Sequence, residues 1–476
     1  MDAILLAFIA YLILVLIIGL VTVRVTRNLD DFALGGQRLG PWVIAFSERA
    51  SGESAWLLIG LPGAALVSGL LELWTVIGCV TGIIVSWIII AKPLRLATGE
   101  YQALTVPELL ARKTGDESGV IRFLSSIIII WFFTFYVAAQ FSGAGKVLNV
   151  TFGLKEMEGM IIGAVIIVLY TMLGGFLAVA WTDLIQGIIM IGTLVILPLV
   201  AAIEYAQLHP AQSLLDWGTL FGGKTGLGAF SGAVAGLSWG LGYMGQPHLV
   251  TRFMAISDPD QIKIGRRIAT AWAIPAFFGA MWIGIIGGAM LQQGVLPVPA
   301  GELTDPEKLM PLMATTLLPA GIAGILISGA IAAMMSTADS QLLVSTTVVT
   351  EDLLGNWARK RSINLLALGR LFTLIVGVVG FILAWRSTEL VFSMVSYAWS
   401  GLGASFGPVL IAILWWKGVT RKGVIAGLVT GSVTTILWAN MSDLRALMTE
   451  RLVSFVLAFL ALVVVSLWEN RQHADS

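Results

Sequence analysis

Apolar segments of about 20 residues recur along the whole chain, and this recurrence constrains its fold more than any other feature. An α-helix of that length crosses the hydrocarbon core of a bilayer. Thirteen such segments, numbered here span 1 to span 13, lie near residues 3–24, 41–67, 69–94, 121–145, 157–179, 184–204, 228–250, 269–292, 311–350, 364–385, 389–416, 423–441 and 449–468. They predict an all-α membrane protein in which residues 1–476 form a single transmembrane domain.

The composition excludes several classes of soluble protein. Charged residues make up 12% of the chain and hydrophobic residues 57%, whereas soluble domains carry about 25% charged residues. A soluble core of this size cannot hide that much apolar surface. The formal net charge is +0, so no excess of positive charge is available for nucleic acid. The single cysteine, Cys79, permits no internal disulfide and no cysteine metal site.

The distribution of basic residues predicts the orientation, because Lys and Arg gather in cytoplasmic loops. With the N-terminus outside, 20 of the 28 basic residues lie on the cytoplasmic side, among them Arg24, Arg27 and Arg252, and 7 lie outside. Arg49 falls inside a span. Span 1 has no basic region before it and no small-residue cleavage site, so we expect a retained span rather than a signal peptide. This pattern predicts thirteen spans with N outside and C inside.

Two spans are interrupted by polar or glycine-rich residues at mid-depth. Span 2 reads PWVIAFSERASGESAWLLIGLPG and span 7 reads GAVAGLSWGLGYMGQPHLV. Five spans begin at each, spans 2–6 (about 41–204) and spans 7–11 (about 228–416), so the two repeats have opposite topology. Transporters built from inverted repeats hold their sites at the midplane, between unwound helices. The alternative is that the glycines only allow close packing; matching positions in both repeats favour the transporter.

Ionisable residues within the predicted spans are functional candidates, because their burial in a membrane is costly. They are Glu48, Arg49, Glu53, Asp183 and Asp339. Hydroxyls flank the last of them at Ser336, Thr337 and Ser340, and residues 336, 339 and 340 share one helix face. Hard cations prefer several oxygen ligands. This pattern favours an ion site over hydroxyls that only bond the preceding turn.

Aromatic and amide side chains lie near the break in span 7. Trp239 and Tyr243 are four residues apart and flank it, and Tyr136 and Gln140 lie in span 4. A pair at this spacing commonly packs in a core, but at a helix break it can wall a small apolar solute. The pattern alone leaves both interpretations open.

Six strings carry a resemblance to a known family. They are DDFALGGQRLGP, WLLIGLPGA, GGFLAVAWTD, WGLGYMGQPH with RFMA, MSTADSQLLV with TEDL, and VSYAWSGLGASFGPV. In these strings the chain resembles the sodium/solute symporter family, and within it the bacterial sodium/proline symporters, from about Asn28 to Trp415. The resemblance implies a LeuT-like core of two inverted five-helix repeats, worked by alternating access in the plasma or inner membrane. Sodium is the implied coupling ion, and no other cofactor is implied.

The resemblance also implies site residues. The usual sodium site maps onto the carbonyls of Ala50, Glu53 and Ala333 and the hydroxyls of Ser336 and Thr337. A second ion position known in some members maps onto Asp183, Ser336, Asp339 and Ser340. The solute site maps onto Tyr136, Trp239, Tyr243 and Pro247, with Ser54, Ala55 and Trp56 in the facing stretch of span 2; Gln140 joins this set from the pattern above.

One stretch departs from the relatives, which typically read SAGASDMSGWLL where this chain reads SERASGESAWLL from Ser47. An aspartate considered important for sodium is Gly52 here, the next residue is Glu53, and Glu48 and Arg49 replace small residues. Three interpretations follow. Glu53 restores the missing carboxylate, or Arg49 pairs with a glutamate and is purely structural, or Arg49 or a protonatable Glu53 replaces the ion. The third would make transport proton-coupled or sodium-independent; we favour sodium.

The expected function is therefore import of a small amino acid, with L-proline favoured, driven by the inward sodium gradient. The expected partners are the solute, sodium and the lipid bilayer, with no obligatory protein partner. A transporter-like solute sensor is less favoured, because the chain ends soon after span 13 without an output domain. An enzyme is not expected, because the three histidines neither pair with a nucleophile nor have a metal-binding spacing.

Overall fold

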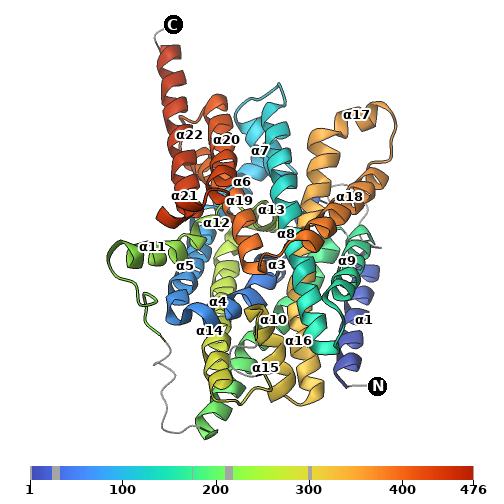
Figure 1. Cartoon of the computed structure of the whole chain (residues 1–476). Coiled ribbons are helices and arrows are strands. Elements are labelled where there is room, and N and C mark those ends of the chain that lie inside the picture. The colour runs from blue at the N-terminus through green and yellow to red at the C-terminus, as the bar shows by residue number, and fades with distance from the viewer. Residues whose placement is uncertain (1–2, 24–32, 174, 209–217, 299–302, 475–476) are drawn as a thin grey trace.

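The structure is a computed structural model that describes residues 3–23, 33–173, 175–208, 218–298 and 303–474. Every named element in this part is a helix, and the long helices run beside one another in a bundle, with α1 at one edge and α20 and α22 at the other (Figure 1). Arg24, Arg27 and the start of the family resemblance at Asn28 lie outside the described ranges.

Ten helices, or runs of joined helices, in the described part are long and apolar enough to cross a membrane. The uninterrupted ones are α1 (Ala3–Val23), α8 (Val120–Phe152), α10 (Phe176–Leu208), α18 (Leu365–Arg386), α19 (Val391–Trp415), α20 (Arg421–Ala439) and α22 (Glu450–Ala474). The others belong to the runs Trp56–Ile89, Pro259–Gln292 and Ala320–Leu353. With α9 (Glu156–Leu173) and the interrupted helices of spans 2 and 7 added, helices occupy all thirteen predicted segments. The prediction of an all-α membrane protein is confirmed.

Both predicted interruptions are present. Span 2 consists of α3 (Pro41–Gly52), the π-helix η2 (Trp56–Gly60) and α4 (Leu61–Ser68), with the break at 53–54. Span 7 consists of α11 (Gly226–Leu237), α12 (Trp239–Gly242) and α13 (Pro247–Ala255), with the break at 243–246. Pro247 begins α13, where its missing N–H costs nothing and its fixed φ suits the first helical position. The helix breaks therefore follow from local sequence.

The predicted boundaries of spans 5 and 9 are wrong. Span 9, predicted at 311–350, is two helices, α15 (Leu309–Leu317) and α16 (Ala320–Thr347). Leu318 between them is extended, with φ −113° and ψ 147°, as expected of a residue that precedes proline. The start of α10 at residue 176 lies inside predicted span 5, so that span ends earlier than 179.

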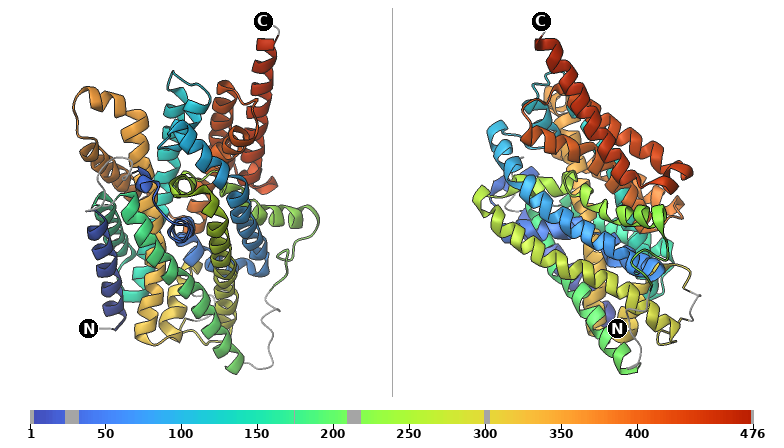
Figure 2. Two further views of the ribbon diagram at one scale, coloured as in Figure 1. Left: turned by 180° about the vertical axis from the view of Figure 1, so that it is seen from behind. Right: turned by 90° about the vertical axis from the view of Figure 1, so that its left-hand side faces the viewer.

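Short helices fill the connections. Two of them, α6 (Ala91–Tyr101) and α7 (Val106–Lys113), lie between α5 (Leu73–Ile89) and α8. The remaining elements are η1 (Gly35–Gln37), η3 (Gly69–Glu72), η5 (Pro259–Gln261), η6 (Pro306–Lys308), η7 (Val348–Leu353), α17 (Gly355–Lys360) and α21 (Ser442–Leu447). Figures 1 and 2 show the N-terminus at one end of the bundle and the C-terminus at the other. In Figure 1, α7 and α17 lie toward the C-terminal end, and α15 lies toward the N-terminal end.

Helix packing relates the two halves of the chain reciprocally. In the first half α5 (Leu73–Ile89) packs on the broken helix α11–α12, and in the second half α14 (Ile262–Gln292) packs on the broken helix α3–α4. The third members, α8 and α16, pack on each other. A Cβ atom on Gly82 would lie 2.3 Å from the Gly240 carbonyl oxygen. Glycine at both positions therefore lets the backbones of α5 and α12 meet.

A buried carboxylate fastens the start of α19 to its neighbours. Glu307, in η6, accepts hydrogen bonds from the backbone N–H groups of Val391 and Phe392 at 2.9 and 2.8 Å. It also pairs with Lys146 of α8 at 2.5 Å, and Asp305 pairs with the same lysine at 2.9 Å. A negative charge at a helix N-terminus is stabilising, because it satisfies free N–H groups and the helix dipole.

We expect Glu307→Ala to lower the free energy of unfolding by about 2 kcal/mol, because it leaves two N–H groups and part of the Lys146 charge without a partner. The loss stays moderate because Asp305 remains beside the lysine. Thermal unfolding in detergent measures it. The matched control is Glu389→Ala, which removes an exposed carboxylate close to the same helix start. Equal midpoints for the two variants would contradict the role given to Glu307.

Candidate functional site

The break in span 2 leaves the last carbonyl groups of α3 without helical partners, and side chains bind them. Ser336 Oγ donates to the Ala50 carbonyl at 2.9 Å, and Thr337 Oγ1 donates to the Ser51 carbonyl at 2.9 Å. Trp56 Nε1 donates to the Gly52 carbonyl at 3.2 Å. A helix C-terminus carries partial negative charge. The end of α3 therefore presents carbonyl oxygens and the negative end of its dipole to hydroxyls of α16.

Four of the five predicted sodium ligands lie near the end of α3, and the Ser336 hydroxyl links three of them. Ser336 Oγ reaches the Ala333 carbonyl at 3.1 Å as well as that of Ala50, and Thr337 follows on the same helix. All four residues are buried. Glu53 lies at the break itself, where its N–H donates to the Arg49 carbonyl at 3.0 Å. A role for the Glu53 carbonyl stays a prediction.

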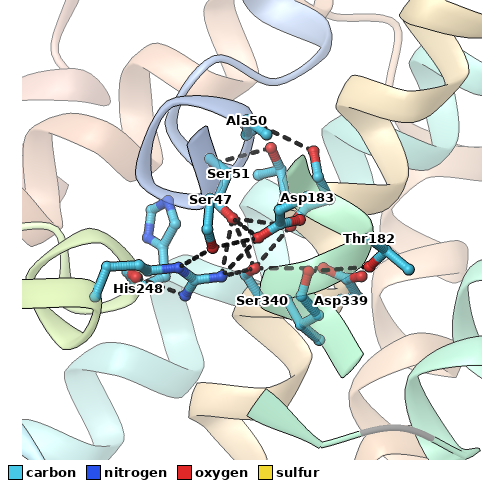
Figure 3. A network of polar contacts seen from close by, with 12 residues as sticks. Ser47, Ala50, Ser51, Thr182, Asp183, His248, Asp339 and Ser340 are labelled. Atoms are coloured by element: carbon cyan, nitrogen blue, oxygen red, sulfur yellow. Dashed lines mark hydrogen bonds and ion pairs between the residues drawn. The ribbon is translucent and has the colours of Figure 1, made fainter. Parts of the chain in front are cut away.

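A second group of oxygens lies beside the first (Figure 3). Asp183 Oδ2, from α10, accepts hydrogen bonds from Ser47 at 2.6 Å and Ser51 at 3.0 Å. The Ser51 and Ser340 hydroxyls are 2.9 Å apart, and Ser340 donates to the Ser336 carbonyl at 2.7 Å. Ser340 Oγ also reaches Asp339 Oδ1 at 3.3 Å. The residues predicted for a second ion position are thus brought together.

The prediction that Arg252 lies in a cytoplasmic loop is wrong. This arginine is fully buried in α13 and pairs with Asp183 at 3.3 Å. The buried half-helix runs to Ala255, past the predicted end of span 7 at 250. The guanidinium is retained in the interior because a carboxylate and several hydroxyls surround it. Arg252 is therefore a buried ionisable residue in addition to the five predicted within the spans.

The charged residues that distinguish this chain form a second buried cluster. Arg49 binds Glu53 Oε1 through NH1 at 2.6 Å and Glu48 Oε2 through Nε at 2.6 Å. Tyr243 donates its hydroxyl to Glu53 Oε1 at 2.9 Å, and Trp87 donates Nε1 to Glu48 Oε2 at 3.1 Å. Arg49 thus pairs with both glutamates, and a purely structural role for it stays a prediction.

The position that lost a carboxylate lies beside this cluster. A Cβ atom at Gly52 would lie 3.8 Å from the Arg49 guanidinium nitrogen NH2. A carboxylate on residue 52 would therefore start next to the same guanidinium that Glu53 binds. That Glu53 takes the place of a carboxylate at 52 stays a prediction.

Aromatic rings close over the two helix breaks. Trp56 stacks on Trp239 with ring centres 4.7 Å apart and planes 11° apart. Trp399 meets the edge of Tyr243 at 4.7 Å, and Phe392 leans on Trp239 at 5.1 Å. Predicted solute residues from spans 2 and 7 thus meet ring to ring. Trp399 and Phe392, from α19, join this cluster without having been singled out; Trp399 lies in the string VSYAWSGLGASFGPV quoted above.

The other predicted solute residues lie around the break in span 2. Gln140 Oε1 accepts a hydrogen bond from the Ala55 N–H at 3.1 Å, and Gln140 Nε2 donates to the Tyr136 carbonyl at 3.2 Å. Ser54 Oγ accepts from the Trp56 N–H at 3.4 Å. Tyr136 itself is buried, as is Pro247 at the start of α13. An amide oxygen is therefore bonded to a backbone N–H at the start of the second half-helix.

Comparison with known proteins identifies the family. The pattern of the sodium:solute symporter family matches residues 32–431. The high-affinity proline transporter PutP of Bacillus subtilis is 39% identical over 462 residues, which cover 95% of each chain. The sodium/proline symporter of Escherichia coli is 37% identical over 469 residues, covering 97% of this chain and 92% of the other. The chain belongs to the sodium:solute symporter family. The resemblance seen in the sequence is confirmed.

Solved structures show the fold of this family member. A sodium-coupled sialic acid symporter in its substrate-bound outward-open state superposes with a TM-score of 0.80 at 17% identity, covering 98% of this chain and 97% of the other. Mhp1, a nucleobase-cation-symport-1 family transporter in a closed conformation, superposes with a TM-score of 0.58 at 14% identity. The coverage is 94% of this chain and 96% of that one. The expected LeuT-like transporter fold is therefore shown.

Proposed function

We propose that this sodium:solute symporter family member imports a small amino acid, with L-proline favoured, together with sodium and by alternating access. The two relatives named above, a proline transporter and a sodium/proline symporter, match this chain over nearly their whole length. The observation that carries the proposal is the meeting of two sets of side chains at the two helix breaks. One set is oxygen-rich and suits a hard cation; the other is aromatic and suits a small apolar ring.

The coupling sodium is assigned to the end of α3. Its proposed ligands are the carbonyls of Ala50, Glu53 and Ala333 and the hydroxyls of Ser336 and Thr337. This assignment is supported by the hydroxyl–carbonyl contacts between α3 and α16. Each hydroxyl can rotate its O–H bond away from an ion and coordinate the ion through an oxygen lone pair. The negative end of the helix dipole also favours a cation.

The solute is assigned to the space that the aromatic stack now fills. Parting Trp56 from Trp239 would let an apolar ring lie between them, with Tyr136, Tyr243 and Pro247 as further walls. The solute carboxylate would replace Gln140 Oε1 as the acceptor of the hydrogen bond from the Ala55 N–H, because helix N-termini attract anions. The neutral oxygen already bonded to that N–H supports this position for the carboxylate.

The finer topology is also proposed. Thirteen crossings, with N outside and C inside, would form one transmembrane domain over residues 1–476. Repeat one would be spans 2–6, about 41–204, and repeat two spans 7–11, about 228–416, in inverted orientation. An odd number of crossings fits termini at opposite ends of the bundle (Figure 1). The reciprocal packing of α5 and α14 on the broken helices supports the repeats.

Uptake by purified protein in proteoliposomes tests the function. We expect uptake of labelled L-proline to be stimulated by an inward sodium gradient and not by a proton gradient alone. Stimulation by an acid-outside gradient without sodium would overturn the sodium coupling. Transport of another amino acid in place of proline would overturn the substrate. Binding of a solute with no uptake under either gradient would favour a sensor.

Replacing Glu53 by glutamine separates sodium from proton coupling. We expect Glu53→Gln to keep sodium-driven uptake with an apparent sodium affinity lowered less than about 10-fold, because the proposed ligand at 53 is a carbonyl and Glu48 still pairs with Arg49. Uptake at varied sodium concentration and pH measures this. Glu48→Gln, which removes the other partner of Arg49, is the matched comparison. Loss of all gradient-driven uptake in Glu53→Gln alone would indicate that this carboxyl carries the coupling proton.

A further inference from the structure

The oxygens around Asp183 form a cage that would suit a hard cation. It is built from the Asp183 carboxylate, the hydroxyls of Ser47, Ser51 and Ser340, and the Ser336 carbonyl. These residues come from α3, α10 and α16, and all are buried. Figure 3 shows the labelled side chains of Ser47, Ser51, Asp183 and Ser340 turned toward one another. Five oxygens of this kind are what sodium or calcium would take as ligands.

A guanidinium group already lies in this cage. Arg252 reaches Ser47 through Nε at 3.2 Å and, through NH2, Ser51 at 2.9 Å and Asp183 at 3.3 Å. The same NH2 group donates to Ser340. A fifth contact, from NH1 to the His248 carbonyl at 2.7 Å, fixes the guanidinium to its own helix. Arg252 thus contacts four of the five cage residues.

A sodium ion beside this guanidinium would be strongly disfavoured. Two unit charges 4 Å apart at an effective dielectric constant of about 20 repel enough to weaken binding on the order of 1,000-fold. The carboxylates Asp183 and Asp339 each keep one buried oxygen without a hydrogen-bond partner among the described residues. When both are ionised, one guanidinium and one sodium at the neighbouring Ser336 hydroxyl balance their charge. A second sodium would leave an uncompensated positive charge.

We propose that the Arg252 guanidinium is a built-in cation that fills the second ion position, so that this chain binds one sodium ion rather than two. The inference rests on the proposed sodium coupling. Removing the guanidinium should convert its cage into a second cation site, because the Asp183 carboxylate and the three hydroxyls would then lack a cation. Arg252 acts here as a resident cation and not as a ligand of the transported ion.

Equilibrium binding of radioactive sodium to the purified protein in detergent tests this proposal. We expect one ion per chain with the unaltered protein and two per chain with Arg252→Ala. Guanidinium chloride should return the alanine variant to one ion, because it refills the cage. Arg252→Lys should keep one ion, since lysine retains the positive charge. The matched control is Arg95→Gln, which removes a guanidinium bonded to the Ile256 carbonyl, just past the end of α13 and away from the cage.

The number of sodium ions bound by the unaltered protein and by Arg252→Ala decides whether the proposal holds. Two ions on the unaltered protein overturn the proposal whatever the variants do, and so does one ion on a folded Arg252→Ala protein. If that variant unfolds without sodium, the sodium dependence of its thermal midpoint replaces the binding count. A steeper rise than for the unaltered protein supports the second site, and an equal slope overturns it. Absence of sodium binding by the unaltered protein overturns the proposed sodium coupling, and this inference with it.

Discussion

Replacing Ser336 and Thr337 together by alanine is expected to weaken sodium binding on the order of 100-fold. A hydrogen-bonding or ligand group that faces a charge contributes about 1.5 kcal/mol, so two lost hydroxyls cost about 3 kcal/mol, which is about 100-fold in affinity. The three proposed carbonyl ligands would remain, so uptake should persist at high sodium concentration. The sodium concentration for half-maximal uptake in proteoliposomes measures the change.

The same helix offers a matched control for this double variant. Ser328 and Thr347 of α16 are also buried, and each donates its hydroxyl to a carbonyl one turn back, those of Gly324 and Leu343, at 2.7 and 2.9 Å. Ser328→Ala with Thr347→Ala removes the same two kinds of hydroxyl away from the break in span 2. It should leave the sodium dependence unchanged. A parallel loss in both double variants would mean that the effect comes from α16 as a whole and not from an ion site.

Replacing Arg49 by alanine is expected to lower the free energy of unfolding by about 3–5 kcal/mol. The change leaves the carboxylates of Glu48 and Glu53 in the interior without their cation, and breaking a buried ion pair by removing one partner has this magnitude. Both glutamates are buried against Trp87 and Tyr243. The thermal midpoint in detergent, and the yield of monodisperse protein, measure the loss.

A neutral triple variant shows whether the charges or the packing are responsible. Glu48→Gln, Arg49→Leu and Glu53→Gln together remove every charge of the cluster at similar volume. We expect this variant to recover most of the lost stability, because buried ion pairs are often replaceable by neutral side chains. Sodium-driven uptake that survives in the triple variant would support a structural role for Arg49. An Arg49→Ala protein as stable as the unaltered one would instead show that the cluster does not need its cation.

Local sequence was sufficient to predict the helix breaks. In span 2 the run from Ser47 to Ser54 is polar within an apolar segment, and in span 7 the glycines precede Pro247, which must begin a new helix. Both breaks appear where these residues lie. The break in span 2 also predicts free carbonyl oxygens at the end of α3, because a helix end leaves its last carbonyls without helical partners. The boundary of span 9 was missed, although Pro319 marks it.

The location of Arg252 was not predictable in the same way. Arg252 lies two residues past the predicted end of span 7 at 250, where a basic residue is usually part of a cytoplasmic loop. Its burial depends on Asp183, 69 residues earlier, and on serines of α3 and α16. None of these contacts follows from helical periodicity, because each joins segments far apart in the chain.

The sequence by itself determined that this protein is a bundle of membrane helices with two interruptions, and it determined the family. Bilayers permit only structures that satisfy their own backbone hydrogen bonds, so apolar length and a few breaking residues are enough to specify helices and breaks. The tertiary structure decided which charges meet. Arg49 and its two glutamates are neighbours along the chain, whereas Arg252 meets Asp183 only through the packing of distant helices. A buried charge is stable only beside its partners, and those partners become neighbours only when distant helices pack together.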